Sequence, residues 1–109
     1  VFMDDGYQHR AIKPNVALLL TDYAHLFSTD TLLPSGRLRE GRYAARRAQA
    51  LVVTKCPADL TAEQAEQLRL HLSKYLKAGT PVFFSYLAYK PIHNHQLTKG
   101  ATIVLVTAI

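Results

Sequence analysis

The sequence predicts an α/β fold in three layers, with helices packed against a mostly parallel sheet. Five short apolar runs support this prediction: residues 1–3, 16–20, 50–53, 81–86 and 102–106. The runs are near-continuous and rich in β-branched or aromatic residues, which is typical of strands buried on both faces of a parallel sheet. Helical segments between the runs imply right-handed crossovers from strand to strand.

Polar residues follow three of these runs, at the points where the predicted strands end. Asp4 and Asp5 follow the first run, Thr21 and Asp22 follow the second, and a Thr–Lys pair follows the third at 54–55. Ligands of open α/β sheets bind at the carboxyl ends of the strands. We therefore expect these polar residues to gather at the functional site.

The clearest helix is predicted over residues 62–77. Thr61 and Gln64 match a capping box, in which two side chains satisfy backbone amides at the helix start. Gly79 and Pro81 end the helix, because glycine suits the left-handed position after a helix and proline cannot continue one. The core is expected to receive Phe83 and the apolar face of this helix, formed by Ala65, Leu68, Leu72, Tyr75 and Leu76.

A second helix is predicted over residues 39–47, after a Ser–Gly turn at 35–36. Tyr43 and Ala44 would face the sheet, and the arginines of this segment would face solvent or a ligand. The segments 23–33 and 90–100 are expected to be loops.

Composition favours one folded unit of 109 residues, because 49% are hydrophobic and 19% are charged. The net charge of +5 suggests an anionic partner. Five arginines lie within residues 37–47, where they could bind phosphate or form a solvated helix face. A single cysteine excludes an internal disulfide, and the absence of CxxC and HExxH gives no indication of a zinc site.

The stretch VFMDDGYQHR, at residues 1–10, is the first candidate for chemistry. An apolar strand that ends in carboxylates has the form of a Walker B segment, and one or two carboxylates suffice to hold Mg²⁺. The alternative is a tight polar turn, because Asp-Asp-Gly is also good turn sequence.

Two further stretches follow. LLPSGRLRE, at residues 32–40, places Arg37, Arg39 and Glu40 after a turn, an arrangement that favours phosphate. Glu40 could ligate a metal or simply pair with the arginines. VVTKCP, at residues 52–57, could read a nucleotide base or be a polar loop with Lys55 in water.

In order and spacing, these stretches resemble the tetraacyldisaccharide 4′-kinase family of lipid A biosynthesis over nearly the whole chain. The family's DDGFQHR stretch stands here as DDGYQHR, and its LLPxGxLRE stretch as LLPSGRLRE. The resemblance implies a P-loop kinase at the cytoplasmic face of the bacterial inner membrane, with ATP and Mg²⁺. Such an enzyme transfers the γ-phosphate of ATP to the 4′-hydroxyl of the lipid A disaccharide 1-phosphate.

The resemblance also implies roles for individual residues, with Arg10 and Arg37 as secondary candidates. Asp4 and Asp5 match the Walker B acids, and Gln8 and His9 match a polar pair near metal and substrate. The catalytic set is Asp4, Asp5, His9 and Arg39; the nucleotide set is Gln8 and Arg39; the metal set is Asp4, Gln8 and Glu40.

The chain departs from the family pattern in three places. Tyr7 replaces phenylalanine, Gly41 stands where proline is expected, and no GxxxxGK[ST] phosphate loop occurs in residues 1–109. We therefore expect residues 1–109 to be one α/β unit, a fragment of a larger kinase domain that lacks the phosphate-loop half. We expect this fragment to be inactive alone, and membrane contact to come from parts of the parent protein outside this chain.

Two other functions stay open at this point. One is a basic module that binds nucleic acid or anionic lipid, whose binding would weaken steeply with salt. No RRM, KH or helix-turn-helix pattern supports it, and nucleic acid is not an expected partner. The other is a different P-loop kinase, which its phosphate acceptor would distinguish.

Overall fold

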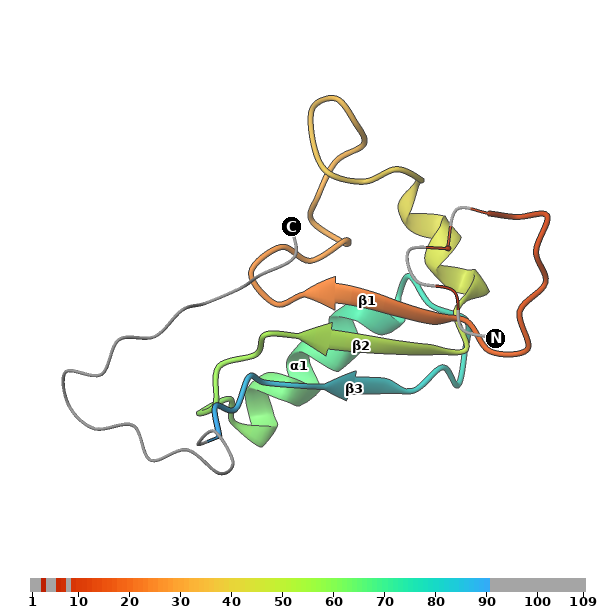
Figure 1. The fold of residues 1–109 in the computed structure, drawn as a ribbon. Coiled ribbons are helices and arrows are strands. Elements are labelled where there is room, and N and C mark those ends of the chain that lie inside the picture. Colours follow the sequence, from red (N-terminus) through yellow and green to blue (C-terminus); the bar gives the residue numbers. More distant parts are fainter. Residues whose placement is uncertain (1–2, 4–5, 8, 91–109) are drawn as a thin grey trace, which may run out of the picture.

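The computed structural model describes residues 3, 6–7 and 9–90. It contains three parallel strands in the order β1-β2-β3, one α-helix and one short 3₁₀-helix (Figure 1). The elements follow one another as β1 (Leu18–Asp22), η1 (Arg42–Arg47), β2 (Ala50–Thr54), α1 (Ala62–Ser73) and β3 (Val82–Phe84). The α/β class and the parallel sheet are therefore confirmed. The strand expected at 102–106 and most of the one at 1–3 lie outside the described residues.

The strands lie close to their expected positions. β1 begins and ends two residues later than predicted and pairs with β2 from Leu18 opposite Ala50 to Asp22 opposite Thr54. β3 is shorter than expected, and it begins after Pro81, which has no N–H to give to a ladder.

Helix α1 begins as expected and ends four residues early. The capping box at its start is present, since Gln64 N–H donates to Thr61 Oγ1 and Thr61 N–H donates to Gln64 Oε1. At its end the Ser73 hydroxyl donates to the carbonyl of Arg69. Beyond it, the N–H groups of Tyr75 and Leu76 bond to carbonyls three positions earlier, as in a 3₁₀-helix. Gly79 has the expected left-handed backbone, with φ of 83°.

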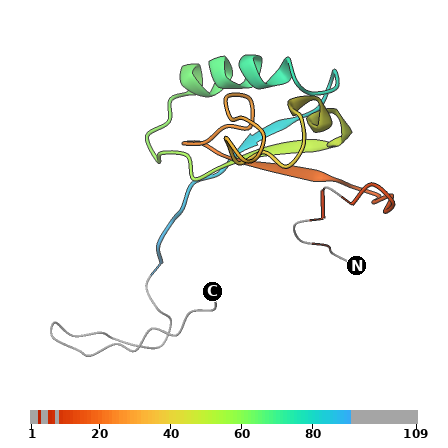
Figure 2. The same ribbon diagram turned by 90° about the horizontal axis from the view of Figure 1, so that it is seen from above.

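The core lies between the sheet and α1, which covers one face of it (Figure 2). Leu51 and Val53 of β2 and Leu72 of α1 have no exposed surface. Strand alternation explains this, because Leu51 and Val53 lie on the same face of the central strand. Phe27, Ala45, Cys56, Leu76 and Val82 complete the buried cluster.

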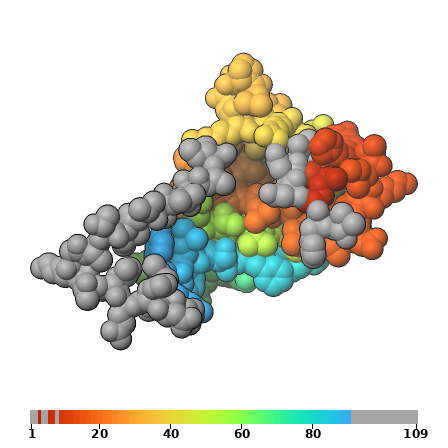
Figure 3. Space-filling view, in the orientation of Figure 1, coloured from red at the N-terminus to blue at the C-terminus, as the bar shows by residue number. Residues whose placement is uncertain are grey.

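The opposite face of the sheet is apolar and open in the described part of the chain. We call Leu18, Leu20, Val52 and Phe83 the open face; Leu18, Leu20 and Phe83 are 56%, 63% and 55% exposed. Figure 3 shows atoms of the three strands side by side on this surface. The expectation that Phe83 belongs to the core is wrong, because it pairs with Val52 and points away from α1.

The second predicted helix is shorter and tighter than expected. Residues 39–41 precede it with Gly41 in extended backbone, and only Arg42–Arg47 form a helix, of the 3₁₀ type. Ala44 is buried as expected, but Tyr43 is 70% exposed and does not face the sheet. Three residues per turn place Ala45 and Ala48 on the inner side instead.

Among residues 3, 6–7 and 9–90, no helix has the length and apolar character needed to cross a membrane.

Candidate functional site

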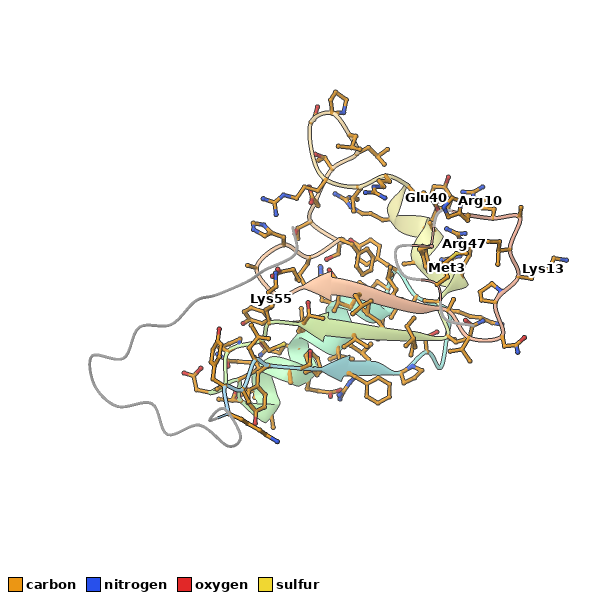
Figure 4. The ribbon with its side chains drawn as sticks, viewed as in Figure 1. Met3, Arg10, Lys13, Glu40, Arg47 and Lys55 are labelled. Atoms are coloured by element: carbon orange, nitrogen blue, oxygen red, sulfur yellow. The ribbon has the colours of Figure 1, made fainter. Side chains whose placement is uncertain are left out.

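The polar residues at the ends of β1 and β2 lie beside one another, but the expectation that they form the functional site is not met at the cavity described below, whose lining includes none of them. Figure 4 shows Lys55 at the opposite end of the sheet from Glu40 and Arg47. Lys55 Nζ lies 2.8 Å from Asp22 Oδ2, and the Thr54 hydroxyl donates to the carbonyl of Thr21 at 3.3 Å. Lys55 has a left-handed backbone, with φ of 55°, directly after β2. The hydrogen bond from Lys55, followed by one from the N–H of Ala24, holds the pKa of Asp22 below its ordinary value. Lys55 is therefore an exposed but paired cation beside the carboxyl ends of the strands.

The LLPSGRLRE segment forms a closed loop around Asp30. The Asp30 carboxylate accepts the N–H groups of Thr31 and Arg37 at 2.8 and 3.2 Å, and the Arg42 guanidinium donates to the Asp30 carbonyl at 2.7 Å. These bonds to Thr31 and then Arg37 lower the pKa of Asp30. A side chain at Gly36 would collide with Thr31, which explains the glycine of this segment.

Glu40, at the end of that segment, is held by two arginines. Its Oε2 lies 2.5 Å from Arg47 Nη2 and 3.6 Å from Arg10 Nη2, and its side chain is 20% exposed (Figure 4). Of the two roles open to Glu40, pairing with arginine is therefore present in this structure. Its partners are Arg47 of η1 and Arg10 of DDGYQHR, neither of which was expected there.

Tyr7 brings the two motifs together. Its hydroxyl donates to the Ala44 carbonyl at 2.7 Å, and the guanidinium carbon of Arg47 lies 4.5 Å from the centre of its ring. Burial, the largest influence, raises the pKa of Tyr7, and the nearby charge of Arg47 opposes that shift. Tyr7 therefore lies against η1, and Arg10 lies next to the end of LLPSGRLRE.

A cavity of about 320 Å³ opens where these segments meet. Its lining includes Tyr7, Arg37, Arg39, Glu40 and Arg42, and the apolar side chains of Leu19 and Phe27 form part of its wall. Three arginines and one carboxylate, itself paired with further arginines, make the cavity electropositive. Guanidinium groups in such a setting suit an anionic group such as phosphate.

The expected site residues are only partly described. Asp4, Asp5 and Gln8 lie outside the described residues. His9 is exposed in a turn, with its N–H bonded to the Gly6 carbonyl at 3.0 Å. Arg39 and Glu40 line the cavity together.

Sequence reasoning missed Tyr7 and Arg47 as contact residues of the site. The contact between Tyr7 and Ala44 spans 37 positions, and no local pattern in the sequence signals it. The one hint was the unusual hydroxyl at position 7, where the resembling family carries phenylalanine.

The described residues are compatible with Mg²⁺ but do not form a complete site. No group of three or more histidine, cysteine or acidic side chains that could hold a metal occurs in the described part of the chain. Glu40 is a single carboxylate there, and Mg²⁺ needs only one or two carboxylates when phosphate oxygens and water supply the rest. The donor chemistry of Glu40 therefore fits, provided that it exchanges an arginine for the metal.

Comparisons with known proteins place the whole chain in one family. The family model for tetraacyldisaccharide-1-P 4′-kinase matches residues 1–109. A tetraacyldisaccharide 4′-kinase of Flavobacterium johnsoniae is 44% identical over 89 residues, covering 82% of this chain and 26% of that protein. Those of Cytophaga hutchinsonii and Phocaeicola vulgatus are 42% and 35% identical over the whole chain, covering 31% and 32% of their own lengths.

The chain thus spans about a quarter to a third of the curated relatives it matches. No solved structure matches it. The two motifs that meet at Glu40 are those on which the resemblance rested, and the family match extends over both. The chain belongs to the tetraacyldisaccharide-1-P 4′-kinase family.

Proposed function

We propose that the full-length protein containing this chain transfers the γ-phosphate of ATP to the 4′-hydroxyl of tetraacyldisaccharide 1-phosphate. One observation of the structure supports this most directly: Tyr7 and Arg10 of DDGYQHR meet η1 and Glu40 of LLPSGRLRE beside an arginine-lined cavity. Family membership supplies the reaction class, and the cavity is suited to an anionic substrate. The reaction takes place at the cytoplasmic face of the inner membrane, through membrane contacts that other parts of the protein make.

The roles we assign are those that the family resemblance implies, and each suits the chemistry of its side chain. Glu40 holds Mg²⁺ together with Asp4 and Gln8, and Asp5 supports them from the same segment. Mg²⁺ held by these residues would supply charge neutralisation to the phosphates during transfer. Arg47 holds the Glu40 carboxylate in place at 2.5 Å, and the longer contact to Arg10, at 3.6 Å, is the one that the metal would replace.

Arg39 binds phosphate oxygens of the nucleotide, and His9 lies near the acceptor. Phosphoryl transfer depends mostly on positioning and charge stabilisation, so fixed guanidinium groups stabilise the transition state more than mobile ones would. Arg42 is one such fixed group, because it is tied to the Asp30 carbonyl. Arg37 and Arg42 add positive charge to the same cavity.

We propose that residues 1–109 act as one unit within a larger kinase domain and have no kinase activity alone. The 109 residues contain no GxxxxGK[ST] loop to cradle the phosphates of ATP. Measurable ATP-dependent transfer by the 109-residue chain would refute this proposal.

The direct test supplies the purified full-length protein with γ-labelled ATP, Mg²⁺ and tetraacyldisaccharide 1-phosphate. Label at the 4′ position is the expected result, and an analogue that lacks the 4′-hydroxyl should accept none. Label on another acceptor would identify a different kinase. A binding titration with a labelled oligonucleotide, in increasing salt, tests the basic-module alternative, for which steeply salt-dependent binding without transfer is expected.

A further inference from the structure

Arg47 contacts both motifs of the candidate site although it belongs to neither. One edge of its guanidinium reaches Glu40 at 2.5 Å, and one face lies over the ring of Tyr7 at 4.5 Å. Figure 4 shows Arg10, Glu40 and Arg47 gathered beside η1. A planar guanidinium can do both at once, because its edge donates hydrogen bonds while its face stacks on an aromatic ring.

The burial of this group separates it from an ordinary surface ion pair. The Arg47 side chain is 36% exposed, but its Nε is buried and finds no hydrogen-bond partner among the described residues. Leaving a buried donor unpaired is unfavourable. Arg47 therefore keeps its contacts with Glu40 and Tyr7 although its own Nε is left without a hydrogen bond among the described residues.

Tyr7 in turn is anchored to the same short helix. Its hydroxyl bonds to the Ala44 carbonyl, three positions before Arg47. One helix of six residues thus fixes Tyr7 through a backbone carbonyl and Glu40 through a side chain. These two contacts, together with the direct ion pair between Arg10 and Glu40, hold the two motifs next to each other.

We propose that Arg47 is a positioning residue, which sets the place of the Glu40 carboxylate relative to the DDGYQHR segment. The proposal deepens the proposed function and rests on it, since it gives Arg47 an effect on Mg²⁺-dependent transfer through Glu40. Arg47 itself need not touch substrate or metal.

The test compares Arg47→Met with Arg46→Met in the full-length protein. Arg46 is the matched control, because it is an exposed arginine of the same helix with no ion pair recorded in the described chain. Arg47→Met should lower kcat and raise the half-saturating Mg²⁺ concentration, by about tenfold to a hundredfold in activity. The KM for the disaccharide should change little, and Arg46→Met should match the parent protein in all three quantities.

A double-mutant cycle with Glu40→Gln tests whether Arg47 acts through Glu40. The double variant should be no slower than Glu40→Gln alone, because residues that act as a unit are not additive. Additive losses, or an unchanged Mg²⁺ requirement in Arg47→Met, would reduce Arg47 to a structural ion pair and overturn the proposal.

A second readout does not depend on activity. In the metal-free protein, the shifts in melting temperature caused by Arg47→Met and Glu40→Gln should also be non-additive. This coupling is expected even if the parent protein fails to phosphorylate the disaccharide, so failure of the proposed function would be recognised separately. Its absence would contradict the contact on which the proposal rests.

If Arg47→Met does not fold, Arg47→Lys tests the proposal in its place. Lysine can keep the charge pair with Glu40 but lacks the planar fork. We expect kcat and the Mg²⁺ requirement of Arg47→Lys to fall between those of the parent and of Glu40→Gln. Values equal to the parent in both would show that charge alone suffices and would overturn the positioning role.

Discussion

The hydroxyl of Tyr7 donates a hydrogen bond of 2.7 Å to the carbonyl oxygen of Ala44, 37 positions further along the chain. This bond joins the DDGYQHR segment to the short helix that follows LLPSGRLRE. It gives the tyrosine of this chain a contact that phenylalanine at the same position would not make. The ring stays in place under Arg47, so the apolar part of the interaction does not need the hydroxyl.

Tyr7→Phe should destabilise the full-length protein by about 1 kcal/mol, the usual net value of one hydrogen bond that is lost. Transfer activity should stay close to that of the parent, because the ring still stacks on Arg47. Tyr89→Phe, at a tyrosine that is 94% exposed, is the control and should change neither quantity. Chemical denaturation at pH 7 measures the difference, and equal stability of the two variants would show that the bond contributes nothing.

The raised pKa of Tyr7 predicts that its contribution to stability falls in alkaline solution. Burial raises the pKa of Tyr7 above its ordinary value of 10.0, so the folded chain favours the neutral phenol. The stabilisation is fully present below pH 10 and is lost as the pH rises through the raised pKa. The advantage of the parent over Tyr7→Phe should therefore shrink in alkaline solution. A constant difference in melting temperature from pH 8 to 11 would contradict this.

Asp22→Asn should reduce stability at neutral pH but not in acid. Its hydrogen bond with Lys55 lowers the pKa of Asp22, so the stabilisation is present above the ordinary value of 3.8. It is lost as the pH falls through the lowered pKa. The parent and the variant should thus converge below pH 3.8, and high salt should bring them together at neutral pH because the pair is exposed.

Asp59→Asn is the control for Asp22→Asn, because the Asp59 carboxyl is exposed and forms no ion pair among the described residues. Acid titrations of the melting temperature, run in parallel on both variants, make the comparison. A gap between parent and Asp22→Asn that persists unchanged into acid would show that the carboxylate charge is not its source.

The open face predicts that another layer covers it in the full-length protein. Parallel sheets are nearly always covered on both faces. Leu20→Lys should therefore destabilise that protein strongly, by several kcal/mol, since it would bury an unpaired charge. Leu70→Lys, at a leucine of α1 that is 62% exposed, should cost far less. Equal melting temperatures for the two variants would mean that the face of Leu18, Leu20, Val52 and Phe83 stays open.

Thr61→Ala should cost about 1 kcal/mol of stability, because it removes the side chain that accepts the Gln64 N–H at the start of α1. Thr61→Ser keeps the hydroxyl and should restore most of that loss. Denaturation of the three proteins side by side measures the difference. If serine proved no better than alanine, the capping box would contribute little to α1.

Local patterns in the sequence predicted the parts of the fold that depend on near neighbours. The capping box of Thr61 and Gln64 and the buried run of β2 were correct, because each depends on residues only a few positions apart. The end of α1 was wrong by four residues, since the Ser73 hydroxyl competes for a helix carbonyl. The prediction that Phe83 lies in the core was wrong, because the sequence of a single strand does not reveal which of its faces is covered.

In the candidate site, too, the sequence predicted residues that belong to local motifs and missed those that depend on long-range contacts. Motif order pointed to Arg39 and Glu40, and the structure brings both to one cavity. The partners of Glu40 lie 30 positions before it and seven after it, and no periodicity relates them. Long-range pairing of this kind depends on how the loops close, which is why Arg47 and Tyr7 emerged only from the fold.

Glu40 is the residue that we propose to act in Mg²⁺-dependent phosphate transfer. The most direct measurement is the transfer rate of Glu40→Gln in the full-length protein, titrated with Mg²⁺ at saturating ATP and disaccharide. Glu66→Gln, at an exposed glutamate paired with Arg69 on α1, is the matched control and should behave as the parent. We predict that Glu40→Gln loses about tenfold to a hundredfold in rate at limiting Mg²⁺ and needs more Mg²⁺ to saturate. Undiminished turnover of Glu40→Gln at limiting Mg²⁺ would contradict the account.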